Sequence, residues 1–221
     1  MKAIIISLFS IVIWISPLSA QEIKEIFIAM PDSITPLLTP NNKKDFIDFR
    51  ESEMKAVVRN KLDSLSEMTV LTKDYFCIRI STASTLEACL LPLSDSTYTI
   101  CLINTYAGPA KESNIRFYNK EWKLLPTEAF ISLPQENDFY NIPTAEDKKE
   151  ELKILRKSAD IYLYAIKLNP QEKSLTINYT TPLYVDKETR KSLLPYLLKD
   201  DICYKWRVEK FLREENKLRI E

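Results

Sequence analysis

The stretch from Thr69 to Leu125 constrains the fold of this chain most strongly. Short runs rich in Tyr, Phe, Ile, Thr and Cys alternate there with polar breaks such as STAST, LSDST and GPAKESN. This is the pattern of consecutive antiparallel strands that are joined by hairpins. The stretch therefore predicts a β-meander, with one further tight turn at Asn119 and Lys120.

Side chains alternate strictly within three strands of this predicted meander. One face collects Phe76, Ile78, Ile80, Leu86, Ala88, Leu90, Tyr98, Ile100 and Leu102, and the other collects Tyr75, Cys77, Arg79, Glu87, Cys89, Leu91, Thr99, Cys101 and Ile103. Such alternation is typical of a sheet with one face on a core and the other partly in water. We therefore expect one packed face and one partly solvated face.

The segment before the meander predicts a helix on the sheet. Residues 23–31 form a short apolar run, which we interpret as a first strand or a buried lead-in. From Glu51 to Met68 the apolar residues recur at the spacing of one helix face, and they are Met54, Val57, Val58, Leu62 and Leu65. We expect a helix over residues 51–66.

The chain after the meander predicts a smaller set of elements. Residues 146–157 predict a charged surface helix, and residues 161–168 and 174–181 predict a hairpin. Asp186 can cap a helix that extends to about residue 198 and that Pro195 kinks or splits. Residues 202–212 predict a closing strand.

The predicted fold class is α+β with a predominantly antiparallel sheet. The N-terminal meander and the C-terminal hairpin and strand pack with a few helices. The proline-rich residues 127–145 predict a linker between an N-terminal lobe at 21–126 and a C-terminal lobe at 146–221. A single compact domain over residues 21–221 is the alternative.

Residues 1–20 have the composition of a secretory signal peptide. Lys2 supplies the positive charge, an apolar core follows, Pro17 breaks the helix and Ala20 offers a small residue for cleavage. A retained anchor is the alternative, but the apolar run is shorter than the ~20 residues that a span needs. We expect an exported protein, periplasmic or secreted to the cell surface, with no stable membrane span after cleavage.

Composition excludes several classes of function. The chain has no histidine, which removes the usual general base, the Ser-His and Cys-His pairs and the commonest zinc ligand. Its only glycine is Gly108, so a glycine-rich phosphate loop is excluded and turns must use Asn, Asp, Pro and Ser. The 31 basic residues equal the 31 acidic residues, so we expect no nucleic-acid partner.

The cysteines have a regular spacing. Cys77, Cys89 and Cys101 recur every twelve residues, which places them on one face of neighbouring strands. With Cys203 they allow three disulfide pairings, but bridges between mid-strand positions are strained. We favour free, buried thiols over disulfides, and the spacing does not fit a cysteine-rich metal site.

No residue stands out as catalytic, cofactor-binding or metal-ligating, and no cofactor is predicted. Asp45 with Asp48 and Asp200 with Asp201 are the closest carboxylate pairs, and both are interpreted as caps or turn residues. Trp122 and Trp206 are interpreted as core residues, with a stacking platform for glycans or peptides as the alternative.

Several segments resemble a family of exported bacterial proteins, typical of gut anaerobes, that is catalogued only as a domain of unknown function. They are IFIAMPDSITPLLTPNNKKDFIDF, DYFCIRIS, LEACLLPL and TTPLYVDKETRKSLLPYLLKDDICYKW. The resemblance implies an envelope or secreted location and brings no reaction or ligand.

These observations favour a non-catalytic binding or assembly module of the bacterial envelope. Its partner would be an envelope protein or a glycan that the sequence does not identify. The alternative is a carboxylate-dependent hydrolase that acts on envelope or glycan substrates, for which Asp45 or Asp200 would have to face a second carboxylate in a cleft.

Overall fold

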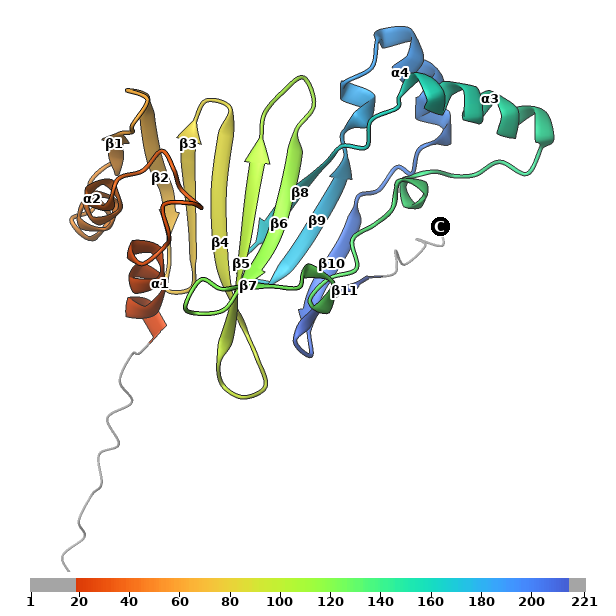
Figure 1. Cartoon of the computed structure of the whole chain (residues 1–221). Helices are drawn as coiled ribbons and strands as arrows, with labels where there is room; N and C mark the ends of the chain where they lie inside the picture. The colour runs from red at the N-terminus through yellow and green to blue at the C-terminus, as the bar shows by residue number, and fades with distance from the viewer. Residues whose placement is uncertain (1–18, 215–221) are drawn as a thin grey trace, which may run out of the picture.

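The computed structural model describes residues 19–214 and contains two antiparallel sheets (Figure 1). The predicted signal peptide lies almost wholly outside the described residues. The first sheet has its strands in chain order, and they are β1 (Val57–Arg59), β2 (Leu65–Leu71), β3 (Tyr75–Ser81), β4 (Ser84–Pro92), β5 (Tyr98–Tyr106), β6 (Glu112–Tyr118) and β7 (Leu124–Leu125). The second sheet has the order β11-β10-β9-β8, from β8 (Tyr164–Asn169), β9 (Ser174–Tyr179), β10 (Ile202–Arg207) and β11 (Lys210–Arg213). The predicted α+β fold and its meander are confirmed.

The helices lie at the two ends of the molecule. Helices α1 (Ser19–Ile28) and α2 (Pro40–Glu51) lie beside β1 and β2, whereas α3 (Glu146–Ser158) and α4 (Lys187–Leu193) lie at the opposite end (Figure 1). Short 3-10 turns cover Thr127–Ala129, Glu136–Phe139, Thr181–Leu183 and Leu194–Tyr196. None of the helices within residues 19–214 has the length and apolar character that crossing a membrane requires.

The centre of the seven-stranded sheet is buried on both faces, which differs from the expectation of one partly solvated face. Phe76, Ala88 and Leu102 belong to a core shared with α1 and α2. Cys89 and Ile103, which point the other way, belong to a core shared with the second sheet. The alternation correctly predicts two faces, but the second sheet covers the face for which we expect contact with water.

Residues 23–31, expected as a first strand or a buried lead-in, are buried as the lead-in predicts, but the strand is wrong because most of them form helix α1. Its buried residues Ile23, Ile26 and Phe27, with Met30 just beyond, have the i, i+3, i+4 and i+7 spacing of one helix face. Because all four are at most 6% exposed, this stripe seats the helix on the sheet. The run was too short for its helical period to be distinguished from a strand.

The helix expected over residues 51–66 is wrong. The segment forms β1, a turn and β2, while the helix lies earlier, where Thr39 caps α2 and Pro40 opens it. The reason is Asn60, which is only 5% exposed. Its Oδ1 accepts hydrogen bonds from the main-chain N–H groups of Leu62 (2.9 Å) and Ser64 (3.2 Å) and so fixes a tight turn.

The apolar spacing that suggested this helix does not mark a buried face. Leu62 and Leu65 are 68% and 62% exposed, and Met54 also lies in water. Only Val58 of the five residues enters the core. A polar residue that organises a turn thus overrides an accidental apolar period.

The C-terminal predictions are mostly confirmed. Helix α3 and the β8–β9 hairpin form as expected, Asp186 caps α4 by accepting the N–H of Thr189 (2.9 Å), and Pro195 opens a separate 3-10 turn. The predicted single closing strand is instead the hairpin β10–β11. Val208 and Glu209 form its two-residue turn with φ of 48° and 66°, a turn conformation that usually selects Asn-Gly.

Candidate functional site

The candidate site is a hollow of about 380 Å³ on the outer part of the seven-stranded sheet. Strands β5 and β6 form its floor, and the loop between α1 and α2 forms one rim. Its lining combines amide, charged and aromatic side chains, which are Ser33, Ile34, Pro36, Leu102, Asn104, Tyr106, Glu112, Asn114, Arg116 and Tyr118.

The hollow begins where the apolar face of β5 ends. Ile100 and Leu102 are buried under α1 and α2, whereas Asn104 is half-buried and Tyr106 is 53% exposed on the same face. Side chains two residues apart on a strand share a face, so these four form one line from the core to the solvent. The helices cover the first part of that line and leave the second part open.

The register of β6 against β5 brings the polar groups together. Asn114 pairs with Asn104, Arg116 with Leu102 and Glu112 with Tyr106. Side chains in such opposed positions lie about 5 Å apart at Cβ. One surface therefore presents two amides, a guanidinium, a carboxylate and a phenol.

The central polar side chains of this surface have no side-chain partners in the part of the chain that the structure describes. Asn104, Asn114, Glu112 and Arg116 make no side-chain hydrogen bond or ion pair with any residue between 19 and 214. Their donors and acceptors are therefore free to bind a ligand in place of water. The guanidinium offers a planar fork of donors, and each amide offers both a donor and an acceptor.

The rim of the hollow is held in place by a buried lysine. Lys43 of α2 is 2% exposed, and its Nζ donates to the main-chain oxygen of Met30 and to Asp32 Oδ1 at 3.2 Å. Ile34, which follows in the same loop, packs against the core. The loop therefore presents Ser33 and Pro36 to the hollow from a fixed position.

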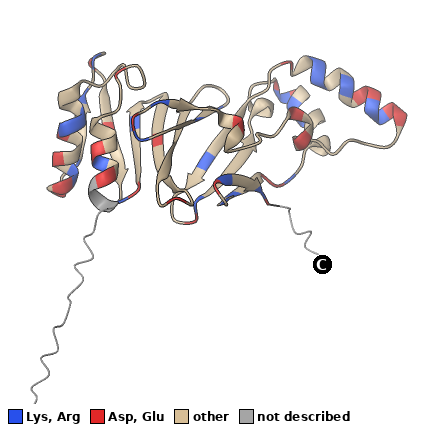
Figure 2. Ribbon diagram, turned by 60° about the horizontal axis from the view of Figure 1, so that its bottom comes forward, with Lys and Arg blue, Asp and Glu red and all other residues tan. Residues whose placement is uncertain are grey.

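Two other hollows have charged linings in which most of the described ion pairs are internal. Under α3, a hollow of about 420 Å³ includes Lys149, Lys153 and Arg156, but these bind Glu146, Glu150 and Glu136. Figure 2 shows the alternating charges of this helix.

The other hollow lies beside β11 and has a volume of about 540 Å³. There Asp138 accepts from Arg213 at 3.0 Å, and the Tyr204 hydroxyl donates to the Ser132 oxygen at 2.8 Å. Lys157 and Lys210 in these two linings are also unpaired, but only in the β5–β6 hollow do both charged side chains and both amides lack a partner within residues 19–214.

The acidic residues considered for hydrolysis are not brought together. Asp45 and Asp48 lie inside α2, so their interpretation as caps is wrong, since Thr39 has that role. Asp200 is exposed in the turn before β10 at the other end of the molecule, and Asp201 accepts from Asn178 (2.6 Å). None of these aspartates lines the three hollows described above.

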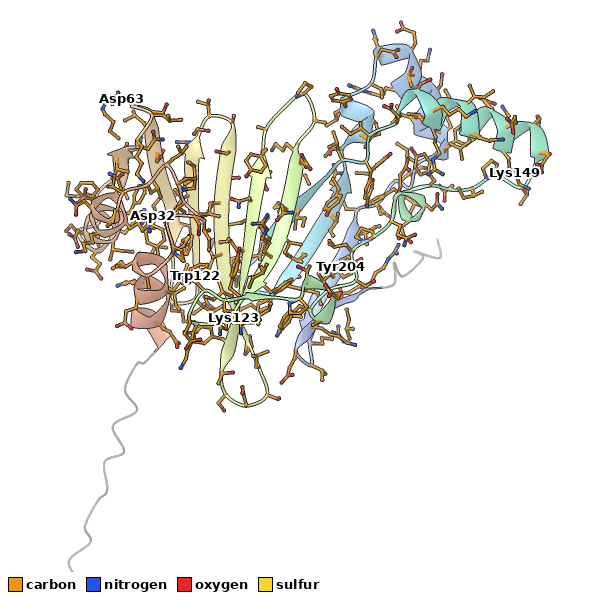
Figure 3. The ribbon with its side chains drawn as sticks, in the orientation of Figure 1. Asp32, Asp63, Trp122, Lys123, Lys149 and Tyr204 are labelled. Atoms are coloured by element: carbon orange, nitrogen blue, oxygen red, sulfur yellow. The ribbon has the colours of Figure 1, made fainter. Side chains whose placement is uncertain are left out.

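The two tryptophans serve the cores. Trp122 is 7% exposed and lies beside α1 (Figure 3). Trp206 is partly buried, stacks on Phe130, and donates its Nε1 hydrogen to the oxygen of Pro92 at 2.9 Å. The interpretation as core residues holds, and neither ring forms an open platform for glycans.

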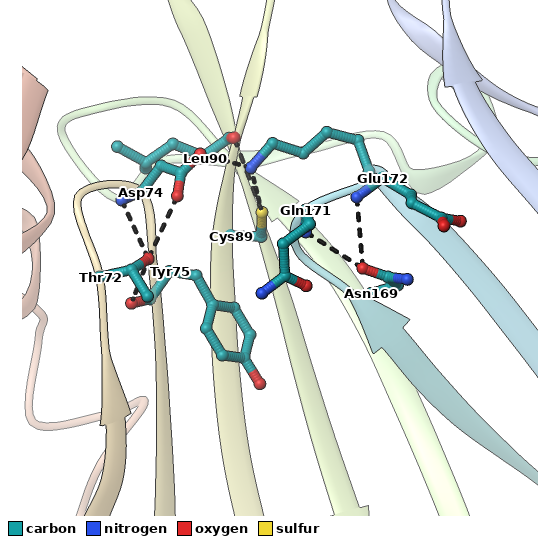
Figure 4. Close-up of polar contacts among 9 residues, drawn as sticks. Thr72, Asp74, Tyr75, Cys89, Leu90, Asn169, Gln171 and Glu172 are labelled. Atoms are coloured by element: carbon teal, nitrogen blue, oxygen red, sulfur yellow. Dashed lines mark hydrogen bonds and ion pairs between the residues drawn. The ribbon is translucent and has the colours of Figure 1, made fainter.

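The four cysteines are free, and one of them faces a lysine. Cys89 is fully buried between the sheets, and the Nζ of Lys173 lies 3.1 Å from its Sγ and 2.6 Å from Asp74 Oδ2 (Figure 4). Burial raises the pKa of the Cys89 thiol to about 11, although Lys173 opposes this rise. The thiol is therefore protonated near neutral pH.

No group of three His, Cys, Asp or Glu side chains within residues 19–214 is arranged to hold a metal ion.

The residues of the β5–β6 hollow were not singled out from the sequence. The sequence does show that positions 104 and 106 share one face of a strand, as do positions 112, 114 and 116. That these two faces form one site follows only from the register of β6 against β5 and from where the helices end.

The chain matches a family and a solved structure that are both described as being of unknown function or uncharacterized. The sequence model of a family described as "Protein of unknown function (DUF3256)" matches residues 15–211. A solved structure of a domain of an uncharacterized protein from Porphyromonas gingivalis W83 is 25% identical, covers 87% of this chain and 98% of that chain, and superposes with a TM-score of 0.77. No curated protein matches the chain.

Proposed function

The chain belongs to the family described as "Protein of unknown function (DUF3256)", and we propose that it is a non-catalytic binding module whose ligand occupies the β5–β6 hollow. The observation that carries the proposal is the set of unpartnered polar side chains on one sheet face, centred on Asn104, Asn114 and Arg116. Protein surfaces rich in unpaired polar groups are ordinary, but here the groups converge in a hollow with an ordered rim.

The chemistry of the hollow favours a glycan as the ligand. Its charges are one guanidinium and one carboxylate, so it has no field that would select a strongly charged ligand. Amide, guanidinium and carboxylate groups together match the mixed donors and acceptors of sugar hydroxyls. The exposed ring of Tyr106 adds an apolar surface with a polar tip, against which a sugar ring can pack.

We further propose that the protein acts outside the cytoplasm, in the periplasm or at the cell surface. The support is the signal-peptide composition of residues 1–20. Envelope glycans and secreted polysaccharides are the ligands that such a location offers. Fractionation of cells that express the full chain, followed by N-terminal sequencing, tests this part: a mature chain that begins at Gln21 supports it, and an uncleaved cytoplasmic chain contradicts it.

The binding proposal is tested with an oligosaccharide array that includes N-acetylated and uronic-acid-containing chains, followed by calorimetry on any chain that binds. We expect Arg116→Ala and the double variant Asn104→Ala/Asn114→Ala each to weaken binding at least about tenfold, which is about 1.4 kcal/mol. The matched control is Lys167→Ala, which removes an exposed basic residue from the middle of β8. An array without binding, or affinity unchanged in both site variants, would contradict the proposal.

A further inference from the structure

A lysine from one sheet meets a buried thiol of the other. Lys173 lies in the turn between β8 and β9, and its Nζ is 3.1 Å from Cys89 Sγ in β4. The same Nζ is 2.6 Å from Asp74 Oδ2, in the turn between β2 and β3. An amine, a thiol and a carboxylate from three separate segments thus converge between the sheets (Figure 4).

The backbone holds the lysine in this position. Lys173 has a φ of 52°, and the turn before it is fixed by Asn169 Oδ1, which accepts the N–H groups of Gln171 (3.1 Å) and Glu172 (3.2 Å). The N–H of Trp206 binds the Lys173 main-chain oxygen at 2.8 Å. Because left-handed φ is unfavourable for lysine, these contacts keep the side chain aimed at the first sheet.

The receiving side is equally ordered. Asp74 accepts the N–H of Leu90 on its main-chain oxygen at 2.8 Å, so its turn is tied to the residue that follows Cys89. Cys89 is 0% exposed, whereas the side chains of Lys173 and Asp74 are 19% and 27% exposed. The amine therefore connects the buried sulfur to the solvent, and a small oxidant can reach the contact from the lysine side.

We propose that Lys173 and Cys89 form a reversible oxidative cross-link in which one oxygen atom joins Nζ to Sγ. It is a modification site that would covalently connect the two sheets. The pair qualifies because nitrogen and sulfur already lie in direct contact.

The reaction balances with dioxygen as the oxidant. Lys173 first loses one ammonium proton to the solvent, which leaves a neutral amine. The S–H bond and one N–H bond then break, S–O and O–N bonds form, and the second oxygen atom leaves as water with those two hydrogens. Sulfur and nitrogen each lose two electrons, and dioxygen gains four. Two molecules of dithiothreitol return the four electrons and restore the thiol, the amine and a molecule of water.

The neighbouring cysteine provides a matched control. Cys101 is directly opposite Cys89 in the β4–β5 ladder and is also 0% exposed. Its side chain makes no hydrogen bond to a lysine within residues 19–214. Oxidation that depended only on burial or on cysteine pairing would therefore affect Cys101 as well, whereas the proposed cross-link needs only Cys89 and Lys173.

The experiment exposes the purified full chain to air-saturated buffer, denatures it and alkylates free thiols with and without dithiothreitol. We expect oxidised protein to lose one of its 4 alkylatable cysteines and to recover it after reduction. Intact mass should rise by one oxygen atom and fall by two hydrogen atoms. Peptide mapping should find the segments that contain Cys89 and Lys173 joined.

The variants decide the assignment. Lys173→Arg keeps the charge and Cys89→Ser keeps the size, and both should abolish the mass change, whereas Cys101→Ser should retain it. Thermal unfolding of the reduced forms checks that each variant folds. Full alkylation of the oxidised wild type, thiol loss that persists in Lys173→Arg, or a joined species without the added oxygen would each overturn the proposal.

Discussion

Trp122 donates its indole Nε1 hydrogen to the main-chain oxygen of Ile26 across 3.0 Å. The bond joins two segments that are 96 residues apart, the turn between β6 and β7 and the last turns of α1. The last four main-chain carbonyl groups of a helix have no N–H partner within the helix. The indole therefore satisfies an end of α1 and fixes that helix to the sheet.

Replacing Trp122 by Phe should destabilise the fold. The phenyl ring is smaller but keeps an aromatic side chain in the core, and the Ile26 oxygen loses its partner, so we expect a loss of about 1–2 kcal/mol. Urea unfolding followed by circular dichroism measures it. Tyr118→Phe is the control, because Tyr118 packs against Trp122 and its hydroxyl has no partner within residues 19–214. Equal losses in both variants would contradict the role of the indole N–H.

Replacing Lys43 by Ala should also destabilise the fold, and it should loosen the rim of the β5–β6 hollow. The variant leaves the Met30 oxygen without its charged donor, which we expect to cost about 2 kcal/mol. Lys44→Ala, in the adjacent and exposed position, should change stability by less than about 0.5 kcal/mol. Thermal denaturation measures both changes in stability. A Lys43→Ala protein as stable as Lys44→Ala would contradict the proposal that Lys43 holds the rim in place.

Val208→Asn should stabilise the protein. Val208 is 90% exposed and has a φ of 48°, so its β-branched side chain strains the turn without contributing to a core. Left-handed backbone costs an ordinary residue roughly 1–2 kcal/mol and asparagine less, so we expect a gain of about 1 kcal/mol. Lys210→Asn, within strand β11, lacks this advantage and should give no gain. A lower melting temperature for Val208→Asn would oppose the argument.

Glu87 should make stability depend on pH. Burial raises the pKa of this carboxyl, while the hydrogen bond from the Tyr75 hydroxyl at 2.6 Å partly opposes the rise. The folded state therefore binds this proton more tightly than the unfolded state, and the stability from it is lost as pH rises from the ordinary carboxyl pKa through the raised one. We expect Glu87→Gln to gain stability relative to the wild type over that interval.

Denaturant titrations of both proteins between about pH 4 and 8 test this, since the interval must contain the ordinary glutamate pKa and the raised one. The informative quantity is the difference between the two proteins, because exposed acids with lowered pKa values, such as Asp186, act in the opposite direction in both. A difference that does not change with pH would show that Glu87 has the same pKa in the folded and unfolded states.

The meander could be predicted because its strands are long, alternate strictly and are separated by polar turns. The same reasoning placed α3, the β8–β9 hairpin and the cap at Asp186. It failed between residues 51 and 68, where the decisive information is the buried hydrogen bonding of Asn60, including its contact with the Ile80 oxygen at 3.1 Å. That contact is tertiary, so no local periodicity carries it.

The turns show a second limit of local reasoning. With one glycine, the chain was expected to turn on Asn, Asp, Pro and Ser, yet the left-handed positions within residues 19–214 also include Trp122, Lys173 and Val208. Trp122 and Lys173 are held there by long-range contacts of their own. The candidate hollow likewise depends on which part of a sheet face the helices leave open, which local sequence does not determine. The lobe boundary expected at residues 127–145 stays a prediction.

The centre of the seven-stranded sheet is buried on both faces, and this limits how sequences of this family can diverge. In the central parts of β3, β4 and β5, neighbouring positions face opposite cores, so neither face of the sheet can accept polar replacements there. A saturation scan should find the central positions of these strands intolerant, whereas the end of β5 and alternate positions of β6 should accept change. Variation between relatives would then accumulate on the open half of β5 and β6, where new specificities can arise without disturbing either core.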